Sequence, residues 1–166
     1  MKVLKAIPTL ILLAAGWTCA HATAHFVTIQ RGQSNLGDAV HGQVIPFTLP
    51  ATVNMSNATA FSAVLDLAVL GSTYGYNEVY INPPTTVCTD NGSDANQAGS
   101  IGMLQKHEDS NLQNEWAVNH IALSSSFLVP GANKIMFCVR NSTGGLDGNL
   151  DNIGLKSIVL LYHTND

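Results

Sequence analysis

Oxygen-bearing side chains cluster just ahead of the last apolar run of this 166-residue chain. Asp147, Asn149 and Asp151 stand at alternate positions, as ligands do in the first half of a calcium-binding loop. The rest of an EF-hand is missing, because Asn152 stands where that loop needs glycine and Ile158 where it needs glutamate. The pattern predicts either a calcium site of another kind or plain turn chemistry, which uses the same residue types.

Aromatic residues beside amides form a second candidate site, of the kind that binds sugars. A sugar ring packs its apolar side on an aromatic face, while amides and carboxylates pair with its hydroxyl groups. Tyr74 and Tyr76 flank Gly75 in a predicted turn and are expected to be exposed, whereas burial in the core is the competing interpretation of Tyr80 and Trp116. The predicted ligand-binding residues are Tyr74, Tyr76, Asn77, Asn114 and Trp116.

Sequence signatures of catalysis are missing from the chain. It has no G-x-S-x-G elbow, no H-E-x-x-H zinc motif, no phosphate-binding loop and no dinucleotide fingerprint. A mature N-terminus at His25 would supply an amine and an imidazole, as in the copper site of lytic polysaccharide monooxygenases. The spacing of the other histidines selects no second ligand for such a site. We therefore expect a non-catalytic protein and keep the copper enzyme as a remote alternative.

The first 24 residues have the layout of a secretory signal peptide. Two lysines precede an apolar run over 6–17, and alanines follow at positions 20, 22 and 24. The run is too short for a membrane span, which takes about 20 apolar residues. Cleavage after Ala22 and cleavage after Ala24 both fit. We expect a secreted, periplasmic or extracellular protein whose residues 25–166 form one domain.

The composition indicates a folded protein with few charges. Hydrophobic residues make up 46% of the chain and charged residues 11%, against a usual charged share of about a quarter. The formal net charge is −4, and the seven lysines and arginines are spread along the chain. That distribution argues against nucleic acid as a partner.

The cysteines predict one disulfide. Removal of the signal peptide takes Cys19 and leaves Cys88 and Cys138, in a compartment where disulfides persist. Two unpaired buried thiols are the alternative.

Short alternating stretches separated by turn residues predict an all-β antiparallel β-sandwich. The stretches are 45–49, 61–69, 77–82, 121–123 and 135–139. The continuous apolar run over 158–162 predicts a central strand covered on both faces. Two long polar stretches, 89–100 and 141–152, are expected to be either functional or mobile.

Segments of the second half resemble the galactose-binding-domain-like jelly roll, the β-sandwich of many secreted carbohydrate-binding modules. The resemblance depends on the order of four segments: 77–82 (NEVYIN), 114–123, 127–135 (FLVPGANKI) and 150–160 (LDNIGLKSIVL). Pro83 departs from the pattern, which has glycine there. The resemblance implies a jelly-roll fold, a glycan ligand and one structural calcium between early and late loops. Its candidate ligands are Asp38, Asp147, Asn149 and Asp151.

Polar side chains beside the predicted strands are also expected to act within the fold. Asp151 and Asn152 precede the final strand, where they can hold a neighbouring loop or an ion. Asn133 follows a Pro-Gly turn and can cap the chain as it enters the next strand.

These patterns predict a secreted non-catalytic module that binds a carbohydrate or a surface glycan. The alternative is a structural or adhesive subunit of an extracellular assembly, because a mostly β chain with few charges suits edge-to-edge association. The expected partners are an extracellular ligand and further copies of the chain, without nucleic acid and without a membrane span.

Overall fold

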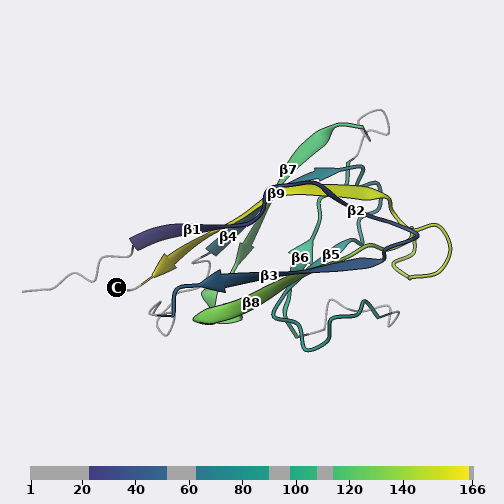
Figure 1. The fold of residues 1–166 in the computed structure, drawn as a ribbon. Helices are drawn as coiled ribbons and strands as arrows, with labels where there is room; N and C mark the ends of the chain where they lie inside the picture. The colour runs from purple at the N-terminus through teal and green to yellow at the C-terminus, as the bar shows by residue number, and fades with distance from the viewer. Residues whose placement is uncertain (1–22, 52–62, 90–97, 108–113, 165–166) are drawn as a thin grey trace, which may run out of the picture.

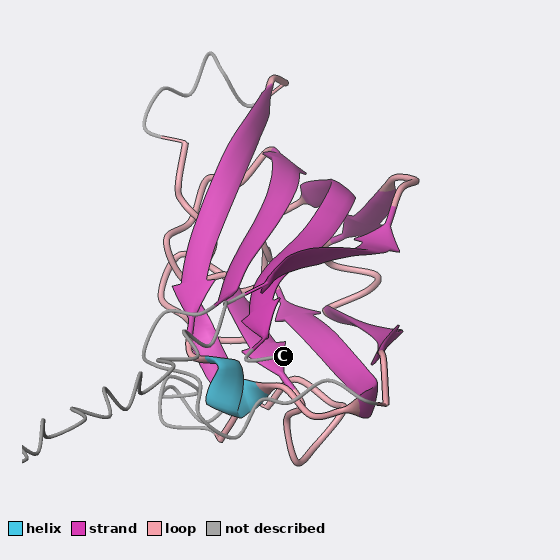
Figure 2. Ribbon diagram, turned by 90° about the vertical axis from the view of Figure 1, so that its left-hand side faces the viewer, coloured by secondary structure: helices cyan, strands magenta, loops and turns pink. Residues whose placement is uncertain are grey.

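The computed structural model describes residues 23–51, 63–89, 98–107 and 114–164. These residues form nine strands and one short 3-10 helix (Ser125–Phe127), and the strands make two sheets that pack face to face (Figures 1 and 2). The strands are β1 (Thr23–Gln30), β2 (Ser34–Leu36), β3 (Gly42–Leu49), β4 (Ala63–Leu70), β5 (Glu78–Ile81), β6 (Ser100–Met103), β7 (Trp116–Leu123), β8 (Gly131–Cys138) and β9 (Ile153–Thr164).

The predicted antiparallel sandwich is confirmed, and its strand order is that of a jelly roll. One sheet has the order β1-β9-β4-β7 with β2 also paired to β9, and the other has the order β3-β8-β5-β6. The chain crosses between the sheets at most connections, the exceptions being β1 to β2 and β5 to β6, and the pairings between these strands are antiparallel. A double-sheet jelly roll limits the length of open sheet edge in this way.

The alternation read from the sequence places one side of each strand in the core. In β4, Ala63, Leu65, Leu67 and Val69 are buried between the sheets, while the residues between them are half-buried on the outer face. The partner sheet contributes Ile135 and other apolar residues of β3, β5 and β8 to the same core. Burial of this apolar surface is the main stabilising contribution to such a fold.

Strand β9 is central in its sheet, but the prediction that both of its faces are covered is wrong. Ile158, Leu160 and Tyr162 are buried in the core, whereas the side chain of Leu161 is 41% exposed. No second layer covers this outer face among the described residues. A continuous apolar run therefore occurs here in a strand with one open face.

Both faces are covered instead in β5 and in the second half of β8. Tyr80, Met136 and Cys138 point away from the main core and form a second small cluster with Val44 and Cys88. The segment that follows β5 lies over this face, because Cys88 contacts β3 and β8 there. Tyr80 is thus fully buried, but in this second cluster rather than between the sheets.

The N-terminal segment through residue 22 lies outside the described residues, and so do most of the polar stretch 89–100 and Phe61. Thr23 is the first described residue of β1 and pairs with Thr164, so cleavage after Ala22 would keep every described residue of this strand. In the described residues, no helix combines the length and the apolar composition that crossing a membrane requires.

Candidate functional site

Strand register brings four loops together at one end of the sandwich. Leu70, the last residue of β4, lies opposite both Gly154 of β9 and Trp116 of β7. Leu36, the last residue of β2, lies opposite Ile153. The loops that start or end at these strand positions therefore meet at the end of the sandwich away from the C-terminus (Figure 1). They cover residues 37–41, 71–77, 114–115 and 139–152.

A polar hollow of ≈ 450 Å³ lies where these loops meet. Most of the surface that lines it is polar. It contains residues from both predicted sites, the sugar site and the calcium site. The lining residues are Asp38, Gly71, Thr73, Tyr74, Asn114, Asn149, Leu150, Asp151 and Asn152.

Asp151 is buried at the base of the hollow and holds the loop between β4 and β5. Its Oδ2 accepts hydrogen bonds from the backbone N–H groups of Thr73 (2.9 Å) and Tyr74 (3.0 Å) and from Asn77 Nδ2 (2.6 Å). Its Oδ1 accepts one from Thr73 Oγ1 at 2.7 Å. An ionised carboxylate has about four acceptor positions. Four protein donors bind it here, three at Oδ2 and one at Oδ1, so Asp151 acts as the loop-holding residue that its position before a strand predicted.

Asn77 continues this network beneath the hollow. Its side chain is fully buried, and its Oδ1 accepts a hydrogen bond from the backbone N–H of Arg140 at 3.0 Å. Besides Asp151, its Nδ2 lies within hydrogen-bond distance of Ser72 Oγ (3.3 Å). Asn77 was predicted to contact a ligand. In this structure it instead supports the residues that line the hollow.

The rim of the hollow is made of side chains that face solvent. Asp38, Asn114, Asn149 and Asn152 are exposed, and Tyr74 is half-buried. Asp38 uses one carboxylate oxygen, Oδ1, to accept the backbone N–H of Leu150 at 2.7 Å. This bond ties the 37–41 turn to the loop before β9.

Three other predicted site residues do not line the hollow. Tyr76 is 46% exposed and its ring lies against Gly144, where an added Cβ would come within 3.5 Å of Cδ1. Trp116 lies on the outer face of the sheet, and the ammonium group of Lys156 sits 3.7 Å from its ring centroid. Asp147 is exposed, and its carbonyl accepts a hydrogen bond from Asn141 Nδ2.

The calcium hypothesis stays a prediction. Of its four predicted ligands, Asp38, Asn149 and Asp151 line the hollow. Four protein donors already bind the Asp151 carboxylate, so Asp38 and Asn149 keep more of their acceptor capacity for a cation. Within the described residues, no three His, Cys, Asp or Glu side chains are grouped as metal ligands.

His25, the residue on which the copper alternative depends, lies within β1 and pairs with Tyr162 of β9. Its ring stacks on the Tyr162 ring with 5.5 Å between centroids, and its Nε2 lies 3.2 Å from Thr164 Oγ1. The copper alternative likewise stays a prediction.

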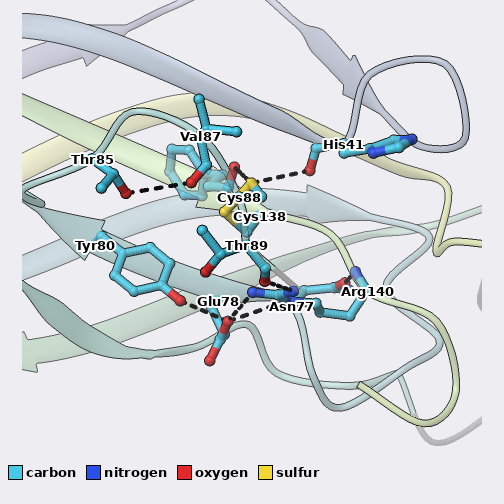
Figure 3. Close-up of a disulfide and its surroundings, with 11 residues drawn as sticks. His41, Asn77, Glu78, Tyr80, Thr85, Val87, Cys88, Thr89, Cys138 and Arg140 are labelled. Atoms are coloured by element: carbon cyan, nitrogen blue, oxygen red, sulfur yellow. Dashed lines mark hydrogen bonds and ion pairs between the residues drawn. A yellow bond between two sulfur atoms is a disulfide. The ribbon is translucent and has the colours of Figure 1, made fainter. Parts of the chain in front are cut away.

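The predicted disulfide is present and covers a buried ion pair (Figure 3). Cys88 and Cys138 are bonded, with 5.8 Å between their Cα atoms. Nearby, Arg140 Nη2 lies 2.9 Å from Glu78 Oε2, and both side chains are almost fully buried. The sequence analysis did not select this pair. Glu78 begins strand β5 and Arg140 follows the apolar end of β8, and a charged residue next to such apolar residues is a signal for a buried partner.

Two further contacts complete the surroundings of this ion pair. Tyr80 donates its O–H to Glu78 Oε2 at 2.7 Å, and Arg140 Nη1 donates to the carbonyl of Thr89 at 2.6 Å. Burial raises the pKa of the Tyr80 phenol, and the hydrogen bond to the Glu78 carboxylate raises that pKa further. The carbonyl of Thr89 follows Cys88 directly, so the disulfide and Arg140 hold the same short segment.

Comparisons with known proteins give similarity in structure but none in sequence. No protein-family model matches the chain, and no curated protein matches its sequence. Among solved structures, the chain is similar to a family 29 carbohydrate-binding module from Piromyces equi. The identity is 13%, the TM-score is 0.38, and 84% of this chain and 91% of that chain are covered.

It is also similar to the K1 cleaved adhesin domain of Lys-gingipain from Porphyromonas gingivalis W83. There the identity is 9% and the TM-score 0.33, with coverage of 83% of this chain and 97% of the other. Similarity this low gives no information on what this chain binds, because one sandwich fold serves many functions.

Proposed function

We propose that this protein is a non-catalytic module that binds a carbohydrate in the polar hollow at the loop end of the sandwich. The observation that supports the proposal is the composition of the hollow. Side chains from four separate segments, 38, 71–74, 114 and 149–152, line one open space of ≈ 450 Å³. They supply two carboxylates, of which Asp151 is already bound by protein donors, together with three amides and one phenol ring.

This set of groups matches the chemistry of a sugar. The amides of Asn114, Asn149 and Asn152 each offer both donors and acceptors, as hydroxyl groups require. The Tyr74 ring offers an apolar surface for the face of a pyranose ring. The backbone of Tyr74 is held by Asp151, so little loop ordering remains to be done when a ligand binds.

The state of the carboxylates favours binding over sugar hydrolysis. Most glycosidases need two carboxyl groups that act on opposite sides of the scissile bond. Asp38 and Asp151 are the two that line this hollow, and the Asp151 oxygens are occupied by four protein donors.

A glycan array, together with pull-down on insoluble polysaccharides, tests the proposal directly. The variants Tyr74→Ala and Asn149→Ala are expected to weaken binding by roughly tenfold each, through lost stacking and lost hydrogen bonds. Tyr76→Ala is the matched control, because Tyr76 lies in the same turn but outside the hollow. The proposal would be contradicted if the folded wild-type protein bound no glycan. It would also be contradicted if Tyr76→Ala weakened binding while Tyr74→Ala and Asn149→Ala did not.

We also propose that the protein acts outside the cytoplasm. The support is the Cys88–Cys138 disulfide, since such bonds persist in oxidising compartments. Expression with the native leader followed by N-terminal sequencing of exported protein tests this. A start at Thr23 or His25 supports export, and an uncleaved intracellular chain with free thiols contradicts it.

A second candidate function, self-association as part of an extracellular assembly, is favoured by one observation. Phe26, Val118 and Leu161 lie on the outer face of the five-stranded sheet with 72%, 59% and 41% of their surface exposed. Light scattering across a range of protein concentrations tests it. A monomer at every concentration would exclude self-association through this face.

A further inference from the structure

A second hollow of ≈ 300 Å³ adjoins the polar one, and its lining is mostly apolar. Asp38 and Asn152 line both hollows, so the two spaces share a boundary made by these side chains. The residues that line the second hollow are Asn35, Leu36, Gly37, Asp38, Ala39, Val40 and Asn152. The proposed sugar site lies in the polar hollow and does not include this second hollow.

Local backbone geometry builds the apolar hollow. Gly37 and Val40 exchange two backbone hydrogen bonds of 3.0 Å, which closes a tight turn with Asp38 and Ala39 at its tip. Asn152 lies directly over Gly37, because a Cβ added there would come within 2.0 Å of Asn152 Oδ1. A glycine at position 37 is therefore what lets Asn152 reach the boundary.

The boundary carries groups that remain available for a ligand. Asp38 uses Oδ1 for Leu150, and no described residue donates to its Oδ2. The Asn152 amide forms no hydrogen bond with another described residue, although its side chain lies between two parts of the site. A carboxylate oxygen can accept an N–H group, and a side-chain amide can donate to a carbonyl.

We propose, on the basis of the proposed function, that the sugar recognised here carries an N-acetyl group. The ring lies in the polar hollow, and the acetamido group crosses the boundary. Its N–H donates to Asp38, its carbonyl accepts from Asn152, and its methyl group packs on Leu36, Ala39 and Val40. This arrangement satisfies every polar atom of the substituent and removes its methyl group from water.

Other common sugars match these groups less well. A plain hexose presents a hydroxyl where the acetamido group would stand, so the apolar surface stays in contact with water. An acidic sugar places a negative charge beside Asp38, and neither hollow has a lysine or arginine in its lining to offset that charge.

Calorimetric titration with matched sugar pairs tests the proposal. The pairs are N-acetylglucosamine with glucose and N-acetylgalactosamine with galactose, each as the free sugar and as its β-linked trisaccharide. Glucuronic acid, which has a carboxylate but no N-acetyl group, is the acidic probe. In at least one pair, the N-acetylated member is expected to bind about tenfold more tightly, from the added hydrogen bonds and the buried methyl group.

Two variants sharpen the result. Val40→Ser should fold normally, because Val40 is already 49% exposed. In this variant the N-acetylated sugar and its plain partner are expected to bind with affinities within about twofold of each other. Val87→Ser is the matched control, because Val87 is 68% exposed on a different loop and should keep the full preference. The same titrations on Asp38→Ala should also lose the preference.

The outcomes separate this proposal from the one it rests on. If the two members bind with equal affinity in every pair, or if the acidic sugar binds best, the N-acetyl assignment is overturned while carbohydrate binding stands. If no sugar binds to a protein that melts cooperatively, the proposed function fails, and this assignment fails with it.

Discussion

Two regions of this molecule put their polar side chains to opposite uses. Beneath the disulfide, the charges of Glu78 and Arg140 are almost fully buried and paired with each other. At the rim of the hollow, Asp38, Asn149 and Asn152 are exposed and direct most of their capacity to solvent. A charge or amide whose partners are all protein groups stabilises the fold, and one whose partners are water can exchange that water for a ligand.

The two regions are joined, so the first supports the second. The backbone N–H of Arg140 donates to Asn77, and the backbone N–H of Asp151 donates to the carbonyl of Arg140. Asp151 then holds the loop that carries Tyr74. The buried network therefore fixes the position of the lining without exposing its own charges.

The buried ion pair should give the largest effect when it is broken. Arg140→Ala leaves the Glu78 carboxylate buried without its partner, which typically costs about 3–5 kcal/mol of unfolding free energy. Urea unfolding followed by circular dichroism measures the loss. The double variant Glu78→Leu with Arg140→Met should recover much of it, because it removes both charges and keeps apolar volume. If Arg140→Ala were as stable as the wild type, the Glu78–Arg140 pair would not be shielded from water.

Removal of the disulfide should have the next largest effect. The bond joins residues 50 apart in sequence, and closing a loop of that size contributes roughly 4 kcal/mol in the chain-entropy account. Cys88→Ala with Cys138→Ala is expected to lower stability by about 2–4 kcal/mol, measured by the same unfolding curves. Titration of thiols in the denatured, unreduced wild type should find none from this pair, and two reactive thiols would contradict the bond.

The same substitution at a buried and at an exposed carboxylate of the hollow compares closed and open positions directly. The Asp151 carboxylate accepts four hydrogen bonds, and in Asp151→Asn the side-chain NH2 group would face some of the same donors. This change is expected to lower the free energy of unfolding by about 1–3 kcal/mol. Asp38→Asn at the exposed rim should change the melting temperature little, because surface substitutions usually lie within about 0.5 kcal/mol. Equal effects in the two variants would mean that the distinction between a closed and an open region is wrong.

The Tyr80 phenol should make stability fall in alkaline solution. Its pKa is raised in the folded chain above the ordinary value of 10.0, so its contribution is complete below pH 10. Above that pH the unfolded chain loses this proton while the folded chain keeps it. Stability should therefore decline by about 1.4 kcal/mol per pH unit for this group.

Tyr80→Phe is the control for this pH dependence. The variant should lose about 1 kcal/mol at neutral pH, because the hydrogen bond to Glu78 is missing. Its stability should then decline less steeply than that of the wild type between pH 10 and pH 11. Parallel curves for the two proteins would show that the phenol titrates alike in both states.

Calcium at the rim should give the smallest effect. A cation held by Asp38 and Asn149 with backbone carbonyls would raise the melting temperature by about 2–4 °C, and a chelator would reverse the shift. Magnesium should not replace it, since it demands a stricter geometry. A melting curve that ignores calcium and chelator alike would leave these residues as rim and turn formers.

The sequence predicted the features that depend on local pattern. Alternation of apolar and polar residues identified the core face of β4 and β8, and the cysteine count identified the Cys88–Cys138 bond. Turn chemistry identified Asn133, whose side chain accepts the backbone N–H of Val129 at 3.0 Å. It also identified Asp151 as a residue able to hold a neighbouring loop. Each of these depends on residue type together with its immediate neighbours or its compartment.

Only the tertiary structure decided how these elements combine. Alternation shows which face of a strand is more apolar but not whether the other face is also covered. The open outer face of β9 and the double coverage of β5 and of the second half of β8 could therefore not be read from their sequences. The strand register sets Leu70 opposite Gly154 and Trp116. This register decides that Tyr74 rather than Tyr76 lines the hollow, and that Asn77 is buried beneath it. That register is a long-range pairing, and a one-residue shift would turn every side chain to the other face.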